Sequence, residues 1–153
     1  LMSAGGVVSP RPSEFTLLMQ NGQMPLIVHD RQEYENMMRL TMSDPPYIPG
    51  PIVSHLTRTA QSRVRIAEKI FREVQPPHSR YLTATKSVNN IPTILIWGDK
   101  DRVVDVSAIA IFKEILPNSQ TVIHPGIGHA PQLERAKESG LAYRKFLTST
   151  PIK

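Results

Sequence analysis

A short and almost unbroken run of apolar residues from Thr93 to Trp97 constrains the fold of this chain more than any other feature. A β-branched run of this length, ended by Gly98, is typical of a strand that is covered on both faces in a parallel sheet. In open α/β sheets, ligands and catalytic groups gather beyond the carboxyl ends of such strands. The carboxylates that follow this strand are therefore candidate site residues by position: Asp99, Asp101 and Asp105.

A second short strand is expected over Gln120 to Pro125, and it leads into the sequence Gly126-Ile-Gly128-His129. The two glycines allow a sharp turn that presents the histidine at the edge of the sheet. Right-handed crossovers between parallel strands return the chain in the same direction. An acid after the first strand and His129 after the second would therefore lie at the same edge, where the acid could orient a general base.

Two helices are expected to flank these strands. The first runs from Val106 to Leu116, and its apolar residues recur at helical spacing. Those expected to face inward are Ile109, Phe112, Ile115 and Leu116. The second helix runs from Pro131 to Leu147 and is expected to close the edge of the sheet. Its buried residues are predicted to be Leu133, Leu141, Phe146 and Leu147.

Residues 10–85 contain no expected strand and are rich in proline and methionine. A short helix is predicted over Ser13 to Met19, with Ser13 as its N-cap. A second helix is predicted after Asp30, whose spacing to Glu33 is that of a capping box, and the stretch from Pro51 to Gln75 is mostly helical in pattern. The methionines of this block could form an adaptable surface for an acyl chain or simply fill small cores; they are Met19, Met24, Met37, Met38 and Met42.

Two motifs carry a resemblance to a known family. They are Trp97-Gly-Asp-Lys-Asp101-Arg-Val-Val and Pro125-Gly-Ile-Gly-His129-Ala-Pro-Gln-Leu-Glu134-Arg135. Together they resemble the C-terminal third of an α/β-hydrolase, over about residues 91 to 149. The resemblance implies that Asp101 is the acid and His129 the base of the family's Ser…Asp…His order. Asp105 either caps the helix that begins at Val106 or is the alternative acid.

The same resemblance implies an α/β fold class, namely the C-terminal portion of the α/β-hydrolase fold, with parallel strands and flanking helices, plus a helical cap. Residues 1–9 would be the end of a core strand and a loop, residues 10–85 the cap or lid, and residues 86–153 the C-terminal part of the core. The order of helices before Trp97, together with the segment that begins Ser3-Ala-Gly-Gly, is more narrowly similar to bacterial lipases of the monoacylglycerol-lipase-like group.

The segment Met2-Ser3-Ala4-Gly5 invites comparison with the nucleophile elbow Gly-x-Ser-x-Gly. Leu1 occupies the position of the first glycine, and no helix is expected to follow, so Ser3 is interpreted as the end of a strand that leaves the sheet. A chain of 153 residues is short for this fold. We therefore expect the N-terminal half, with the nucleophilic serine and the oxyanion hole, to be missing from this chain, and the chain alone to be inactive.

Composition excludes several other classes. The absence of cysteine rules out disulfides, thiolate metal sites and a cysteine nucleophile. Asp101 and His129 have no further ligands at a recognisable metal-binding spacing, so neither a metal nor a cofactor is expected. The formal charge of +5 is dispersed and no nucleic-acid module is recognisable, so no nucleic-acid partner is expected.

Residues 63–72 form a basic amphipathic stretch that could lie on a membrane surface or pack on its own domain.

The leading hypothesis is a serine hydrolase that cleaves carboxylic esters, as a lipase or esterase acting on acylglycerols. One alternative is a carbon–carbon bond hydrolase or another capped α/β-hydrolase, because the acid and the histidine are shared among them. Another is a non-catalytic, hydrolase-like binding module.

None of the other histidines has a sequence setting like that of His129. His124 is expected to pack within its strand, and the others are His29, His55 and His78.

Overall fold

The computed structural model describes residues 1–74 and 91–149. Strand β1 (Ile94–Gly98) is buried along its whole length, as the apolar run predicts. Strand β2 (Gln120–His124) lies parallel to it, in a register that pairs Ile94 with Gln120 and Gly98 with His124. Both predicted strands are confirmed, and their carboxyl ends lie at one edge of the sheet.

The first residues of the chain run along the other side of β1. Met2 forms a parallel bridge with Ile96, whose N–H donates to the carbonyl of Leu1 at 2.9 Å. The N–H of Ser3 donates to the carbonyl of Ile96 at 3.0 Å, and the next helix begins only at Glu14. Ser3 thus lies beside β1 and is not directly followed by a helix; that it ends a core strand stays a prediction.

Helix α5 (Ala108–Ile115) connects the two strands and packs its apolar face on one side of them. The main core cluster contains Val7, Leu95, Trp97, Ala108, Ile109, Phe112, Ile115 and Leu116. The rings of Trp97 and Phe112 lie with their centroids 5.9 Å apart, and the indole N–H donates to the carbonyl of Val104 at 3.0 Å. All four residues predicted to face inward from this helix are buried.

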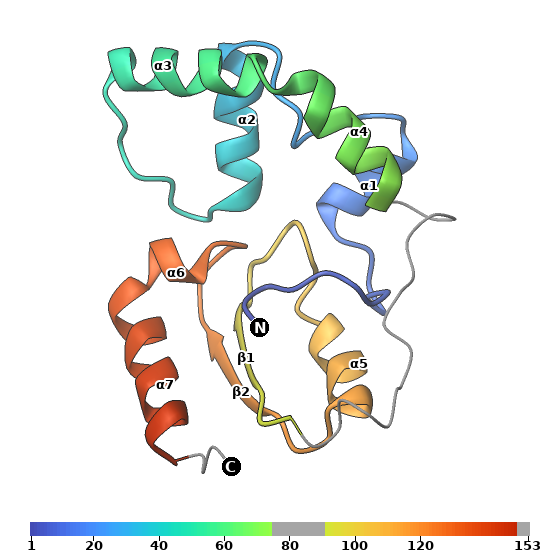
Figure 1. The fold of residues 1–153 in the computed structure, drawn as a ribbon, viewed down its shortest axis with the longest axis vertical. Helices are drawn as coiled ribbons and strands as arrows, with labels where there is room; N and C mark the ends of the chain where they lie inside the picture. Colours follow the sequence, from blue (N-terminus) through green and yellow to red (C-terminus); the bar gives the residue numbers. More distant parts are fainter. Residues whose placement is uncertain (75–90, 150–153) are drawn as a thin grey trace.

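On the other side of the strands the chain forms helix α6 (Pro131–Glu134) and helix α7 (Ala136–Ser149), as Figure 1 shows. The prediction of one helix from Pro131 to Leu147 is wrong, because the helix is interrupted at Arg135. The predicted buried face is also wrong for Leu133, Leu141 and Leu147, which are exposed, while Phe146 is half-buried.

The buried position of α7 is Ser139, which the apolar pattern could not reveal. Its hydroxyl donates to the carbonyl of Pro131 at 3.0 Å and lies 3.1 Å from Nε2 of His124. His124 is buried in β2, as expected. A polar pair, rather than leucines, therefore joins this helix to the sheet.

The helices of residues 10–74 gather at one end of the molecule (Figure 1). They are α1 (Glu14–Gln20), α2 (Arg31–Thr41), α3 (Gly50–Gln61) and α4 (Val64–Val74). The helical stretch predicted from Pro51 to Gln75 is thus two helices, and Gln75 lies outside the described residues. A second core cluster joins α2 to α3 through Val28, Tyr34 and Val53.

The two predicted N-caps, Ser13 and Asp30, are confirmed, whereas the reciprocal bond of the predicted capping box is not formed. The hydroxyl of Ser13 accepts from the N–H of Thr16 at 3.1 Å, and Oδ1 of Asp30 accepts from the N–H of Glu33 at 2.8 Å. The Glu33 carboxylate reaches back to the N–H of His29, one residue before the N-cap, rather than to Asp30 itself. Local side-chain bonds of this kind satisfy N–H groups that the first helical turn leaves without partners.

Candidate active site

The turn after β1 fixes the carboxylate of Asp101. Oδ1 of Asp101 accepts from the N–H groups of Val103 and Val104, both at 2.9 Å. The side chain has no exposed surface. A buried carboxylate held by two backbone donors has a defined orientation, and one of its oxygens remains to face a further partner.

The turn after β2 lies directly against this first turn. Gly126 has a φ of +74°, a conformation that favours glycine, and its N–H donates to Oδ1 of Asp99 at 2.6 Å. The N–H of Lys100 donates to the carbonyl of Ile127 at 2.9 Å. A Cβ atom at Gly98 would lie only 2.1 Å from the carbonyl oxygen of Ile127. The two turns are therefore locked together by backbone contacts.

This packing brings Asp101 and His129 into contact. Nδ1 of His129 lies 3.1 Å from Oδ1 and 3.0 Å from Oδ2 of Asp101. An ionised carboxylate can only accept, so Nδ1 carries the proton and donates it. Nε2 is then the ring nitrogen with a free lone pair, and it makes no hydrogen bond with residues 1–74 or 91–149. The histidine is 29% exposed, so its ring can be reached.

The other predicted carboxylates have different partners. Asp99 is exposed and supports the Gly126 turn. Asp105 accepts from the N–H of Ser107 at 2.8 Å and from Nε of Arg11 at 3.2 Å. Partial burial alone would raise the pKa of Asp105, but the hydrogen bonds from Ser107 and the Arg11 guanidinium hold that pKa below its usual value. Asp105 thus caps the turn before α5.

The remaining histidines lie elsewhere. His29 is exposed and its Nδ1 lies 2.9 Å from Glu33, while His124 bonds to Ser139 inside the fold. His55 is exposed on α3. His78 lies outside the described residues. Within residues 1–74 and 91–149, no group of His, Cys, Asp or Glu side chains is arranged to hold a metal ion.

The two turns also contact the segment after α2, and these contacts are not predicted by the sequence. The backbone N–H of His129 donates to the carbonyl of Thr41 at 2.8 Å. Arg102 donates to the carbonyls of Arg39 and Met42, the latter at 3.0 Å. The Glu134 carboxylate accepts from the N–H groups of Ser43 and Asp44. Arg102 and Glu134 lie in the two motifs, but no local pattern could identify their partners some sixty or ninety residues away.

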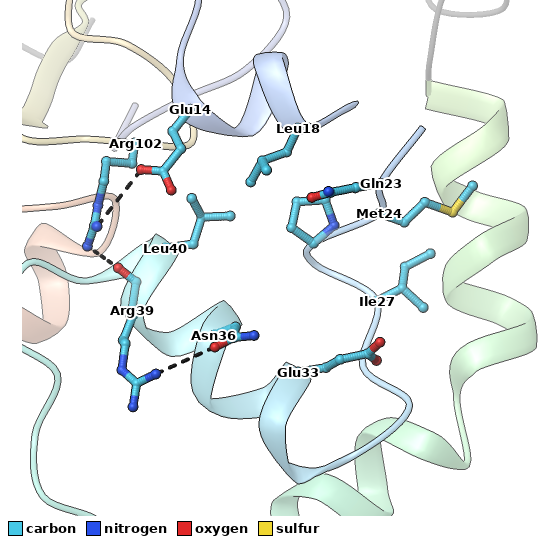
Figure 2. Close-up of a pocket in the computed structure, with 11 residues that line it drawn as sticks. Glu14, Leu18, Gln23, Met24, Ile27, Glu33, Asn36, Arg39, Leu40 and Arg102 are labelled. Atoms are coloured by element: carbon cyan, nitrogen blue, oxygen red, sulfur yellow. Dashed lines mark hydrogen bonds and ion pairs between the residues drawn. The ribbon is translucent and has the colours of Figure 1, made fainter. Parts of the chain in front are cut away.

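A cavity of about 550 Å³ opens between α1, α2 and residues 23–27, and Arg102 lies at one end of it (Figure 2). Its apolar lining residues are Leu18, Met24, Pro25, Ile27 and Leu40. Nη1 of Arg102 lies 3.9 Å from the Glu14 carboxylate. Of the methionines considered above, Met24 lines this cavity, whereas Met37 and Met38 pack against the second core cluster. The rest of the cavity's lining is polar or charged, and neither Asp101 nor His129 is among the lining residues.

The fold and the two turns define a class of protein. A family model described as the alpha/beta hydrolase fold matches residues 28–136. The match spans more than half of the chain, and the chain therefore belongs to the α/β-hydrolase family.

Particular relatives narrow the comparison. The chain is 27% identical over 137 residues to Lipase 3 of Moraxella sp. (strain TA144), covering 90% of this chain and 42% of that lipase. It is 29% identical over 128 residues to the monoacylglycerol lipase ABHD6 of Rattus norvegicus, covering 83% of this chain and 38% of the relative. The chain thus spans less than half the length of these curated relatives.

Solved structures agree with the fold. The crystal structure of a membrane phospholipase A, described as a bacterial virulence factor, is similar with a TM-score of 0.87 and 29% identity, covering 97% of this chain and 47% of that chain. A 2-hydroxy-6-oxo-6-phenylhexa-2,4-dienoate hydrolase from Rhodococcus sp. strain RHA1 has a TM-score of 0.74 at 18% identity, covering 97% of this chain and 54% of that chain. The second likeness shows the fold alone.

Proposed function

We propose that this chain supplies the acid and the base of a serine hydrolase that cleaves carboxylic esters, as a lipase or esterase acting on acylglycerols. The observation that carries the proposal is the contact between His129 Nδ1 and the buried Asp101 carboxylate at the end of β1. Curated relatives named as lipases and monoacylglycerol lipases support the choice of esters over other substrates.

In the proposed reaction, His129 Nε2 takes the proton of a serine hydroxyl as the serine attacks the ester carbonyl. Asp101 holds the ring in the tautomer that leaves Nε2 free, and its negative charge stabilises the imidazolium that forms. The imidazolium then returns the proton to the departing alcohol. In the family's Ser…Asp…His order, the nucleophilic serine comes before the acid and the base in the chain, and we assign the attack on the ester to that serine.

We assign residues 10–85 to a helical cap, between a core strand end at residues 1–9 and the C-terminal core at residues 86–153. The cavity between α1 and α2, which Arg102 of the core also lines, would accept an acyl chain. Contact with a membrane surface is a further part of the proposal. Its support is the exposed pair Ile66 and Ile70 on α4, flanked by Arg63 and Lys69. None of the described helices has the length and apolar character needed to span a bilayer.

A substrate panel on the intact natural protein tests the proposed reaction. We expect it to hydrolyse monoacylglycerols and nitrophenyl esters, and a fluorophosphonate probe to label one serine. The panel includes vinylogous diketones, the substrates of carbon–carbon bond hydrolases. Faster turnover of the diketones would favour that alternative, and the absence of both turnover and labelling would favour a binding module.

The acyl-chain assignment predicts a change in chain-length preference. Leu18 projects into the cavity in Figure 2, so Leu18→Trp should fill part of it. We expect kcat/KM for long-chain esters to fall by about tenfold while short-chain esters are affected much less. Leu17→Trp is the matched control, because Leu17 lies on the same helix, is exposed and does not line the cavity. Equal losses for long and short chains in Leu18→Trp would contradict the assignment.

A further inference from the structure

The carboxylate of Glu134, the last residue of α6, binds backbone N–H groups from two distant parts of the chain. Oε1 accepts from the N–H of Gly128 at 2.9 Å. Oε2 accepts from the N–H of Ser43 at 2.8 Å and from that of Asp44 at 3.2 Å. The first donor directly precedes His129, and the other two follow α2. One side chain therefore bridges the turn of the candidate base and the helical block.

Close backbone packing joins the same two parts. The N–H of His129 donates to the carbonyl of Thr41 at 2.8 Å. A Cβ atom at Gly128 would lie 2.9 Å from both Ser43 N and Thr41 O, and 3.0 Å from Oε1 of Glu134. No room remains for a side chain between the turn and residues 41–44. A displacement of either part must therefore shift the other part as well.

We infer that Glu134 is a positioning residue for His129, whose turn it clamps to residues 41–44 so that the imidazole stays against Asp101. This inference rests on the proposed function, in which His129 is the base. A carboxylate suits the task because it offers acceptors only, and hydrogen bonds to a charged acceptor are stronger than neutral ones. The clamp also ties the position of the helical block to that of the base.

Two substitutions test separately the charge and the length of the Glu134 side chain. Glu134→Gln keeps the length but turns an N–H₂ group toward donors, and Glu134→Asp keeps the charge but shortens the side chain. In the intact natural protein we expect both to lower kcat for a short-chain ester by about 10- to 100-fold, the loss that small misplacements of a reacting group cause. KM should change less than about threefold. Gln132→Ala, at an exposed position of α6, should behave as the unmodified protein.

A spectroscopic readout distinguishes positioning from general destabilisation. The proton that His129 Nδ1 donates to Asp101 should give a low-field proton NMR signal that is absent in His129→Ala. We expect this signal to weaken or vanish in Glu134→Gln and Glu134→Asp while thermal unfolding shows the variants still folded. If one of the two variants unfolds, the NMR signal and kcat of the other, folded variant decide.

The outcomes separate this inference from the proposed function. Retention of both the NMR signal and kcat in folded Glu134→Gln would overturn the positioning role of Glu134. A loss of kcat that matches the loss of folded protein, with the signal unchanged per folded molecule, would also overturn it. Full ester hydrolysis by His129→Ala would instead refute the proposed function, whereas the NMR signal reports on the clamp without reference to activity.

Discussion

Replacing Asp101 by asparagine is expected to lower kcat for ester hydrolysis by about 10⁴-fold in the intact natural protein, because this change in a Ser-His-Asp triad leaves the geometry but favours the wrong imidazole tautomer. The Asp101 carboxylate accepts the proton of His129 Nδ1 and has no exposed surface. An asparagine amide can donate to Nδ1 instead, which places the ring proton on Nε2. Nε2 could then no longer take the proton of a serine.

The matched control is Asp99→Asn, the same chemical change two residues earlier. Asp99 is exposed, and an asparagine carbonyl can still accept from the N–H of Gly126. We expect this variant to keep activity within about twofold. Steady-state kinetics with a nitrophenyl ester measures both variants. Comparable losses of activity in the two variants, or an active Asp101→Asn enzyme, would rule out Asp101 as the acid. Asp105 would then be the remaining candidate.

Replacing Gly98 by alanine is expected to destabilise the protein by about 3 kcal/mol or more. The added Cβ would lie 2.1 Å from the carbonyl oxygen of Ile127 and 2.2 Å from that of Gly128. Both are backbone atoms of the turn that carries His129, so they cannot move aside as a flexible side chain could. A glycine inside a strand often marks such a close approach of another backbone.

The comparison for this prediction is Gly140→Ala in α7, where an added Cβ meets nothing within 4 Å. Alanine stabilises a helix relative to glycine by roughly 0.5–1 kcal/mol, so Gly140→Ala should be neutral or stabilising. Urea unfolding monitored by circular dichroism gives both free energies. A Gly98→Ala variant as stable as the unmodified protein would show that the two turns are less tightly locked than the structure indicates.

The elements that could be predicted are those whose signals are local. Strand β1 could be predicted because every one of its residues is buried. Its sequence is therefore apolar throughout, without the alternation of apolar and polar residues that a half-exposed strand shows. The caps at Ser13 and Asp30 depend on atoms within a few residues. Helix α7 could not be predicted as well, because its buried position is a serine whose partner, His124, lies fifteen residues away. An apolar pattern carries no information about a polar contact of this kind.

The sequence alone determined the strands, the helix caps and the pair of residues proposed as acid and base, since these follow from the period of apolar residues and from two short motifs. Tertiary structure alone decided that Asp101 and His129 touch, that Gly98 leaves room for the turn of the histidine, and that Glu134 joins this turn to residues 41–44. The physical reason is that these contacts connect residues between about thirty and ninety positions apart. Only the folded packing of strands and helices brings such groups within hydrogen-bonding distance.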